Sequence, residues 1–98
     1  MTVRHIVLID YDPQAGEAAI AAAIDRLNEL PKLIPGIRAW TIHEAIATRE
    51  GSHRFALVSD FDDLAAVEAY LAHPAHVAVV AANGPILKSF AENDHYLD

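Results

Sequence analysis

The sequence contains no cysteine and few basic residues, and both shortages exclude classes of function. Without thiols, the chain has no disulfides, thiolate nucleophiles or iron–sulfur ligands. Lys and Arg number 7 against 14 Asp and Glu, and the formal net charge of −7 repels nucleic-acid phosphates and anionic lipids. The apolar run near the N-terminus, Ile6 to Ile9, is too short for a signal-peptide core or a membrane span. We therefore expect a cytoplasmic protein with no nucleic-acid partner and no membrane partner.

Patterns that bind cofactors are also missing from the sequence. None of the glycines is grouped in a loop that would cradle phosphates. His73 and His76 have a spacing at which two imidazoles can share a divalent ion, but Pro74 between them disturbs the helical geometry, and no third ligand converges on them. We therefore expect no organic cofactor, no nucleotide and no tightly bound transition metal.

The chain that remains is long enough for one domain with a modest core, over residues 1–98, and 53% of its residues are hydrophobic. The segment from Val3 to Tyr11 is rich in β-branched and aromatic residues and predicts a strand that is apolar on both faces. Apolar residues at three- and four-residue spacing predict a helix over 18–30. The other expected elements are strands over 37–46 and 55–61, a helix from Asp62 or Asp63 to His73, a short helix from Pro74 to a left-handed cap at Asn83-Gly84, and a strand over 90–97.

This order of elements, βαββαβ, predicts the ferredoxin-like α+β fold, with two helices on one face of a four-stranded antiparallel sheet. The opposite face is expected to be apolar, and a large apolar face is rarely left to water on a soluble monomer. We therefore expect two copies to pair sheet against sheet in a homodimer with two-fold symmetry, a dimeric α+β barrel, with each pocket between the sheet and helices of one subunit. Trp40 is assigned to the dimer face rather than to a ligand.

The stretch from Tyr70 to Val77, YLAHPAHV, holds the one plausible chemical site. Tyr70, His73 and His76 recur every three residues, and Pro74 breaks the helix in which they would share a face. Two helices that meet at such a break aim side chains into their junction. A histidine transfers protons near neutral pH, and a tyrosine hydroxyl polarises an oxygen beside it.

Four fragments together resemble the dimeric α+β barrel stress-responsive (Dabb) family over essentially the whole chain. They are RHIVL at 4–8, IPG at 34–36, ALVSDF at 56–61 and YLAHPAHV at 70–77. The resemblance implies a ferredoxin-like fold and a dimer. It leaves the activity open, because the family includes plant stress-inducible proteins, a plant polyketide cyclase that forms olivetolic acid, and a plant hydroxynitrile lyase.

The cyclase is the comparison that assigns roles to single residues. Its catalytic tyrosine and histidine match Tyr70 and His76, and its pocket histidine on the first strand matches His5. A second pocket tyrosine of the cyclase falls at Leu27, so one phenolic contact is missing here. The resemblance thus implies catalytic roles for His76, Tyr70 and His5.

Each of these residues also has a structural interpretation. His76 can pack or cap the helix junction, and His5 can be a hydrogen-bonded core residue. His73 is assigned to capping the new helix rather than to chemistry. Three further histidines, and an acidic run near the C-terminus, are assigned to exposed strands, loops or a solvated edge: His43, His53, His95, and Glu92 to Asp94.

Two classes of function follow. The first is a cofactor-independent cyclase or lyase that acts on an apolar carbonyl compound by acid–base chemistry of His76 and Tyr70. The second is a non-catalytic dimeric protein that binds a small apolar ligand or protects under stress. A cavity that reaches both residues would favour the first class, and a cavity lined by neither would remove it.

Overall fold

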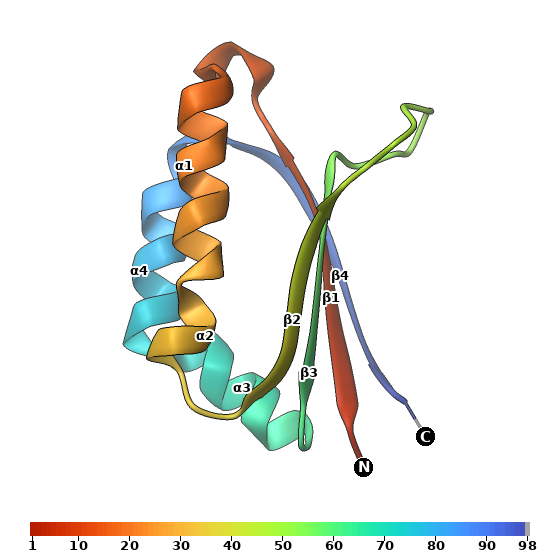
Figure 1. Cartoon of the computed structure of the whole chain (residues 1–98), viewed down its shortest axis with the longest axis vertical. Helices are drawn as coiled ribbons and strands as arrows, with labels where there is room; N and C mark the ends of the chain where they lie inside the picture. Colours follow the sequence, from red (N-terminus) through yellow and green to blue (C-terminus); the bar gives the residue numbers. More distant parts are fainter. Residues whose placement is uncertain (98) are drawn as a thin grey trace.

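A computed structural model of the chain describes residues 1–97. Among these residues, four strands form one antiparallel sheet in the order β2-β3-β1-β4, and the helices cover one of its faces (Figure 1). The elements in chain order are β1 (Val3–Tyr11), the 3-10 helix η1 (Pro13–Ala15), α1 (Glu17–Asn28), α2 (Leu30–Leu33), β2 (Ile37–Glu44), β3 (Phe55–Phe61), α3 (Leu64–Ala72), α4 (Pro74–Asn83), the 3-10 helix η2 (Gly84–Ile86) and β4 (Leu87–Tyr96). The expected ferredoxin-like topology is confirmed.

Local sequence signals explain most element boundaries. Asp12 ends β1, where its side chain accepts a hydrogen bond from the Gln14 amide, and Gly16, with φ of 91°, admits the sharp entry into α1. Asp63 caps α3 by accepting from the amide of Ala66 at 2.8 Å. The side chains of Asp12 and Asp63 each accept a hydrogen bond from a backbone amide that has no partner within the first turn of its helix.

Three predicted boundaries need correction. Pro31 does not begin a turn but lies in the first turn of α2, where its missing N–H is tolerated. Gly84 is right-handed, with φ of −53°, because the chain continues into η2 through Pro85 instead of stopping at a left-handed cap. β4 begins at Leu87, three residues before the predicted strand, since it pairs with β1 along nearly its whole length.

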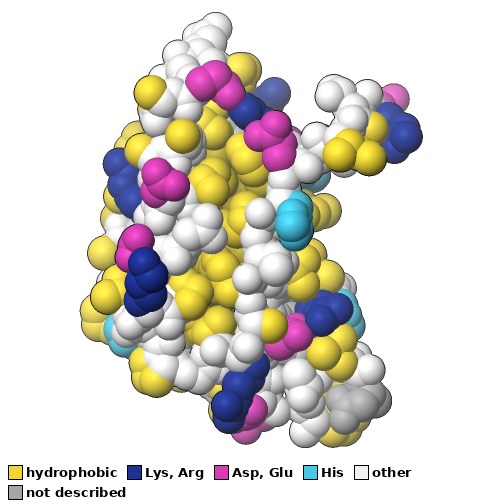
Figure 2. All heavy atoms as spheres, in the orientation of Figure 1, with side chains coloured by type: hydrophobic (Ala, Val, Ile, Leu, Met, Phe, Trp, Pro, Cys, Tyr) yellow, Lys and Arg dark blue, Asp and Glu magenta, His cyan; other side chains and the backbone are white. Residues whose placement is uncertain are grey.

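The core lies between the sheet and the helix layer. Odd-numbered residues of β1 and β3 point toward the helices, as the strand periodicity requires, and all of them are buried except Val7, which is half-buried. Apolar side chains of α1 and α3 meet them there, and Figure 2 shows this apolar layer between α1 and the sheet. The largest fully buried side chains of this core are Phe61, Leu30, Leu57, His5, Val3 and Val67.

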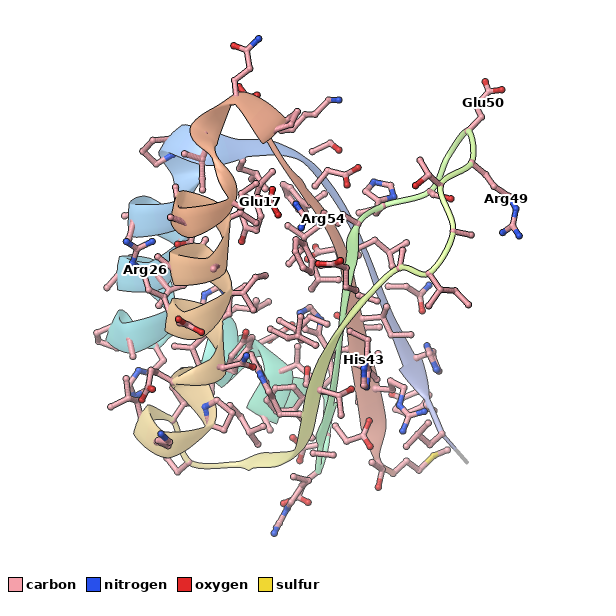
Figure 3. The ribbon with its side chains drawn as sticks, turned by 45° about the horizontal axis from the view of Figure 1, so that its top comes forward. Glu17, Arg26, His43, Arg49, Glu50 and Arg54 are labelled. Carbon is pink, nitrogen blue, oxygen red and sulfur yellow. The ribbon has the colours of Figure 1, made fainter. Side chains whose placement is uncertain are left out.

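One end of this layer is closed by an ion pair that links the helices to the sheet. Arg54, just before β3, and Glu17 of α1 point toward one another (Figure 3), and the guanidinium donates to both carboxylate oxygens at 2.9 and 2.6 Å. Glu44 at the end of β2 accepts from the same guanidinium at 3.2 Å. These contacts hold the pKa of Glu17 below its ordinary value, chiefly through the hydrogen bond from Arg54. Because the pair is partly exposed, it contributes little to the free energy of unfolding, but it links α1 to the start of β3.

The prediction that Trp40 lies on the dimer face is wrong. Its register partner on β3 is Ser59, a buried residue on the helix side. The indole Nε1 donates to Oδ1 of Asn28 in α1 at 2.9 Å, so the ring packs inward. Alternation had placed Trp40 and His43 on opposite faces, but it does not tell which face the helices cover.

The open face of the sheet is apolar in its centre and polar at its rim. Its central residues come from β1, β3 and β4: Ile6, Leu8, Ala56, Val58 and Ala91. At the rim, Arg4 forms a two-pronged ion pair with Asp60 at 2.8 and 3.0 Å. No single helix among residues 1–97 is long and apolar enough to span a membrane, and the pair formed by α3 with residues 74–86 reaches that length only with a bend of 60°.

The short helix α2 gives a direct test of the core. Leu30 is fully buried and Leu33, in the same helix turn, is 57% exposed. Leu30→Ala should lower the free energy of unfolding by ~2–5 kcal/mol through lost burial and a cavity. Leu33→Ala is the matched control and should change it by less than ~0.5 kcal/mol. Urea unfolding followed by tryptophan fluorescence measures both, and equal effects would contradict the placement of α2.

Candidate functional site

A cavity of about 320 Å³ lies between the sheet and the helices, where the sequence predicted a pocket. Its volume is at the lower end of the ~300–1,000 Å³ typical of small-molecule sites. Most of its wall is apolar, from strands and helices alike: Val7, Ile9, Leu27, Leu57, Leu71 and Val79. Val80, Leu87 and Phe90 also line it and are 55, 37 and 57% exposed, so the cavity opens to solvent between α4 and β4.

Pro74 creates the junction at which the polar residues of this cavity meet. The residue before it, His73, is extended at φ −63° and ψ 137°, as a following proline requires, so α3 ends and α4 starts in a new direction. The imidazole Nδ1 of His73 accepts a hydrogen bond from the Ala75 amide at 3.0 Å. His73 is therefore a helix cap, as predicted, and its ring is committed to the backbone.

Tyr70 and His76 lie on either side of this junction and touch. Tyr70 is in the last turn of α3 and His76 in the first turn of α4, and the centroids of their rings are 4.6 Å apart. Both residues line the cavity. On a regular helix, residues six apart are turned ~120° from one another and lie ~9 Å apart along the axis, so it is the bend that brings the two rings together.

Tyr70 is 2% exposed, and its ring is held by aromatic neighbours from three strands and a helix. The neighbours in the sheet are Phe61, His5 and Trp40, whose ring centroids lie 5.2 to 6.1 Å from that of Tyr70. Its hydroxyl has no hydrogen-bond partner among residues 1–97, so it is available to a ligand in the cavity. Burial raises the pKa of Tyr70, and the group is therefore a neutral phenol that donates rather than a base.

His76 has one nitrogen fixed and one free. Nδ1 lies 3.0 Å from the carbonyl oxygen of Leu71, and because a carbonyl only accepts, Nδ1 carries the hydrogen. Nε2 of the neutral ring is then an acceptor, without a protein partner in the described chain. Burial lowers the pKa of His76, assisted by the nearby His5, while the Leu71 carbonyl and Glu92 raise it. The net shift is downward, so the neutral, proton-accepting form prevails at neutral pH.

His5 lies in the same cavity, 1% exposed, with its ring 6.0 Å from that of Tyr70. Its Nδ1 forms a short contact with Oδ1 of Asp94 on β4, the register partner of His5 on the neighbouring strand. The carboxylate holds the proton on Nδ1 and orients the ring, which leaves Nε2 as the second nitrogen for a ligand.

Sequence reasoning missed the role of the acidic residues of β4. Glu92 and Asp94 had been assigned to a solvated edge, but both are on the helix side of the strand, where Glu92 lines the cavity and Asp94 binds His5. The alternation of side chains along a strand could have predicted this placement, because Glu92 and Asp94 lie two and four residues after Phe90, which also lines the cavity. Pairing with His5, however, depends on a register between segments 89 residues apart.

The remaining histidines lie outside the cavity. His43 and His95 are exposed on strands, as expected, and His53 is half-buried in the loop before β3. No group of three or more side chains suited to a metal ion occurs in the described part of the chain, residues 1–97. Leu27, in the position of the missing tyrosine, is 8% exposed and contributes apolar wall.

Together, the fold and the cavity define a class: a ferredoxin-like α+β domain that encloses an apolar cavity with a histidine and a tyrosine at one end. The chain belongs to the stress responsive A/B barrel domain family, Dabb, whose model matches residues 3–96. It is also similar to an uncharacterised protein of Streptomyces coelicolor, 35% identical over 81 residues that cover 81% of this chain and 84% of that one.

Solved structures support the same fold. A dimeric ferredoxin-like protein of unknown function from Thermobifida fusca is 28% identical, with a TM-score of 0.85 over 99% of this chain and 92% of that one. A hydroxynitrile lyase from Passiflora edulis has a TM-score of 0.89 over 99% of this chain and 94% of that one. At 19% identity, the lyase shows a shared fold and not a shared reaction.

The lowered pKa of His76 makes stability depend on pH. The unfolded chain, with a histidine pKa of ~6.5, takes up a proton that the folded site resists. The free energy of unfolding should therefore fall as the pH drops below ~6.5, until the pKa of the folded state is passed. His76→Gln keeps a donor for Leu71 and should lose this part of the dependence. Urea unfolding of both proteins across this range tests it, and parallel pH profiles would contradict the buried, neutral state of His76.

Proposed function

We propose that this protein is a cofactor-independent enzyme that acts on a carbonyl compound by acid–base chemistry, as a cyclase of polyketide-like chains or a lyase. The observation that carries the proposal is the contact of His76 with Tyr70, at a ring distance of 4.6 Å, inside an apolar cavity. One residue offers a free accepting nitrogen and the other a free hydroxyl. Such a pair fits proton removal next to a carbonyl.

In a cyclisation, Nε2 of His76 would take the proton from a carbon next to a carbonyl. The electron pair of that C–H bond moves to the carbonyl oxygen, where the Tyr70 hydroxyl donates a hydrogen bond to the enolate. The enolate carbon then attacks a second carbonyl carbon of the same chain, and the imidazolium returns its proton to the new alkoxide. The apolar walls limit the contact of the enolate with water to the opening between α4 and β4.

In the cleavage of a cyanohydrin, the same groups would act on an O–H bond. His76 takes the hydroxyl proton, the C–C bond to the nitrile breaks, and the leaving cyanide receives the proton. The fold shared with the Passiflora edulis lyase and the match of Tyr70, His76 and His5 to the pattern of the polyketide cyclase support these two reaction types. In a cyclisation, His5, whose Nδ1 contacts Asp94, would orient the second carbonyl through its other ring nitrogen.

The alternative function is non-catalytic binding of a small apolar ligand. It is favoured by the departure at Leu27, which replaces a polar pocket contact with apolar wall. In that case the hydroxyl of Tyr70 contributes at most one hydrogen bond.

Enzyme and binding protein differ in what two substitutions do to turnover. If the pair acts in the transition state, His76→Ala and Tyr70→Phe should each lower kcat by roughly 10²-fold or more with little change in ligand affinity, and their effects should not add. The measurement is a screen of β-polyketones and cyanohydrins against wild type, both single variants and the double variant. His73→Asn, at the capping residue, is the control and should retain turnover. Turnover that survives in His76→Ala would move the site to His5, and no turnover by wild type would favour binding.

We infer in addition that two copies pair through the open sheet face. The inference is supported by the apolar centre of that face and by the dimeric state named for the Thermobifida fusca protein. Leu8 is 37% exposed at this centre, although it is a large apolar side chain on a strand. Pairing would remove this surface from water.

A charge placed on the open face should therefore abolish the dimer. Leu8→Asp is expected to sediment as a monomer in analytical ultracentrifugation at low micromolar concentration, where wild type sediments as a dimer. Leu33→Asp, on the exposed side of α2, is the matched control and should leave the dimer intact. A monomeric wild type, or a dimeric Leu8→Asp protein, would show that the interface lies elsewhere.

A further inference from the structure

The cavity has a second polar end, remote from His5 and His76. Its lining follows β1 from His5 to Tyr11 and α4 from His76 to Asn83, in the same direction. His5 and Tyr11 are ~20 Å apart along the strand, and His76 and Asn83 are ~10 Å apart along the helix. The wall between the two ends is apolar except for Glu92, which lies beside Val7 on the neighbouring strand. At the far end, Tyr11 and Asn83 are 7% and 6% exposed, and neither has a part in the chemistry proposed above.

The side-chain amide of Asn83 has a fixed orientation. Arg26 of α1, in the helix layer (Figure 3), donates from Nη1 to Oδ1 of Asn83 at 3.0 Å. A guanidinium has no acceptor, so the atom that faces it must be the amide oxygen. The amide nitrogen Nδ2 therefore points the other way, to the carbonyl oxygen of Ala23 at 3.1 Å and to the hydroxyl of Tyr11 at 3.4 Å.

This orientation decides what the Tyr11 hydroxyl can do. Because Nδ2 only donates, the hydroxyl oxygen of Tyr11 is the acceptor in their contact, and its own hydrogen is not used there. No acceptor for that hydrogen occurs among residues 1–97. Burial raises the pKa of Tyr11, so the hydrogen stays on the oxygen at neutral pH. A buried donor without a partner favours a ligand that supplies an acceptor.

We propose that Tyr11 and Asn83 form a second binding subsite, which donates a hydrogen bond to a carbonyl-type oxygen at the far end of an elongated apolar ligand. The inference rests on the proposed function and narrows its substrate class: the reacting carbonyl lies at His76 and Tyr70, and another oxygen lies beyond an apolar stretch. A chain with spaced ketones meets this requirement, and a chain that ends in a plain alkyl tail does not. The positive charge of Arg26 behind the amide adds to the preference for an electron-rich oxygen.

Two matched ligands test this subsite. One is a β-diketone with a linear alkyl tail, and the other is the same compound with a ketone in place of the penultimate methylene of the tail. Their dissociation constants are measured by calorimetry on wild type, Tyr11→Phe and Asn83→Asp. The ratio of the two constants on one protein sample is the readout, because a partly unfolded fraction affects both ligands equally.

Tyr11→Phe removes the donor, and the ratio should shift ~3- to 10-fold toward the alkyl-tailed compound. Asn83→Asp keeps the hydroxyl but offers it a carboxylate acceptor, so the hydrogen turns away from the cavity and the ratio should shift the same way. Ratios in both variants equal to that of wild type would overturn the subsite.

The outcomes also separate the subsite from the proposed reaction. A wild type that prefers the ketone-tailed ligand through Tyr11, yet converts neither compound nor any cyanohydrin, would keep the subsite and overturn the enzyme. Turnover that depends on His76, with equal binding of both tails, would keep the enzyme and overturn the subsite. Absence of binding to either ligand would overturn the subsite, and together with no turnover of any cyanohydrin it would overturn both.

Discussion

The ring of Tyr70 is the contact on which the site depends. It packs against His5, Phe61 and Trp40 from three strands of the sheet and against His76 from the next helix, with ring centroids 4.6 to 6.1 Å away. The packing fixes how far α3 stands from the sheet and points the tyrosine hydroxyl into the cavity. Pro74 determines which residue of α4 contacts Tyr70, because the break at His73 changes the direction of the chain and brings His76 against the Tyr70 ring.

Polar groups in this cavity are few, and nearly all of them are oriented by a second group. Leu71 fixes the tautomer of His76, Asp94 orients His5, and Asn83 fixes the role of Tyr11. A buried polar atom without a partner is unfavourable, so each of these pairs satisfies one atom of a side chain and leaves the other for a ligand. The apolar wall lowers the local dielectric constant and so strengthens those remaining interactions.

The two faces of the sheet have different tasks. The helix side holds the cavity, where His5 pairs with Asp94 of the neighbouring strand and Tyr11 with Asn83 of α4. The open side is apolar in its centre, with charged residues such as Arg4 and Asp60 paired at its rim. Strands β1 and β3 serve both faces, which explains why their sequences are apolar at successive positions instead of alternating.

The sequence alone determined the order of the elements, the break at Pro74, the capping role of His73 and the family, because these depend on periodicity, on the backbone restrictions of proline and on contiguous fragments. It also brought Tyr70, His76 and His5 together as candidates. Only the tertiary structure decided that Trp40 packs against α1, that Asp94 holds His5, and that Asn83 donates to the hydroxyl of Tyr11. The reason is physical: alternation along a strand separates two faces without saying which one the helices cover, and pairs between distant segments depend on a register that no local pattern encodes.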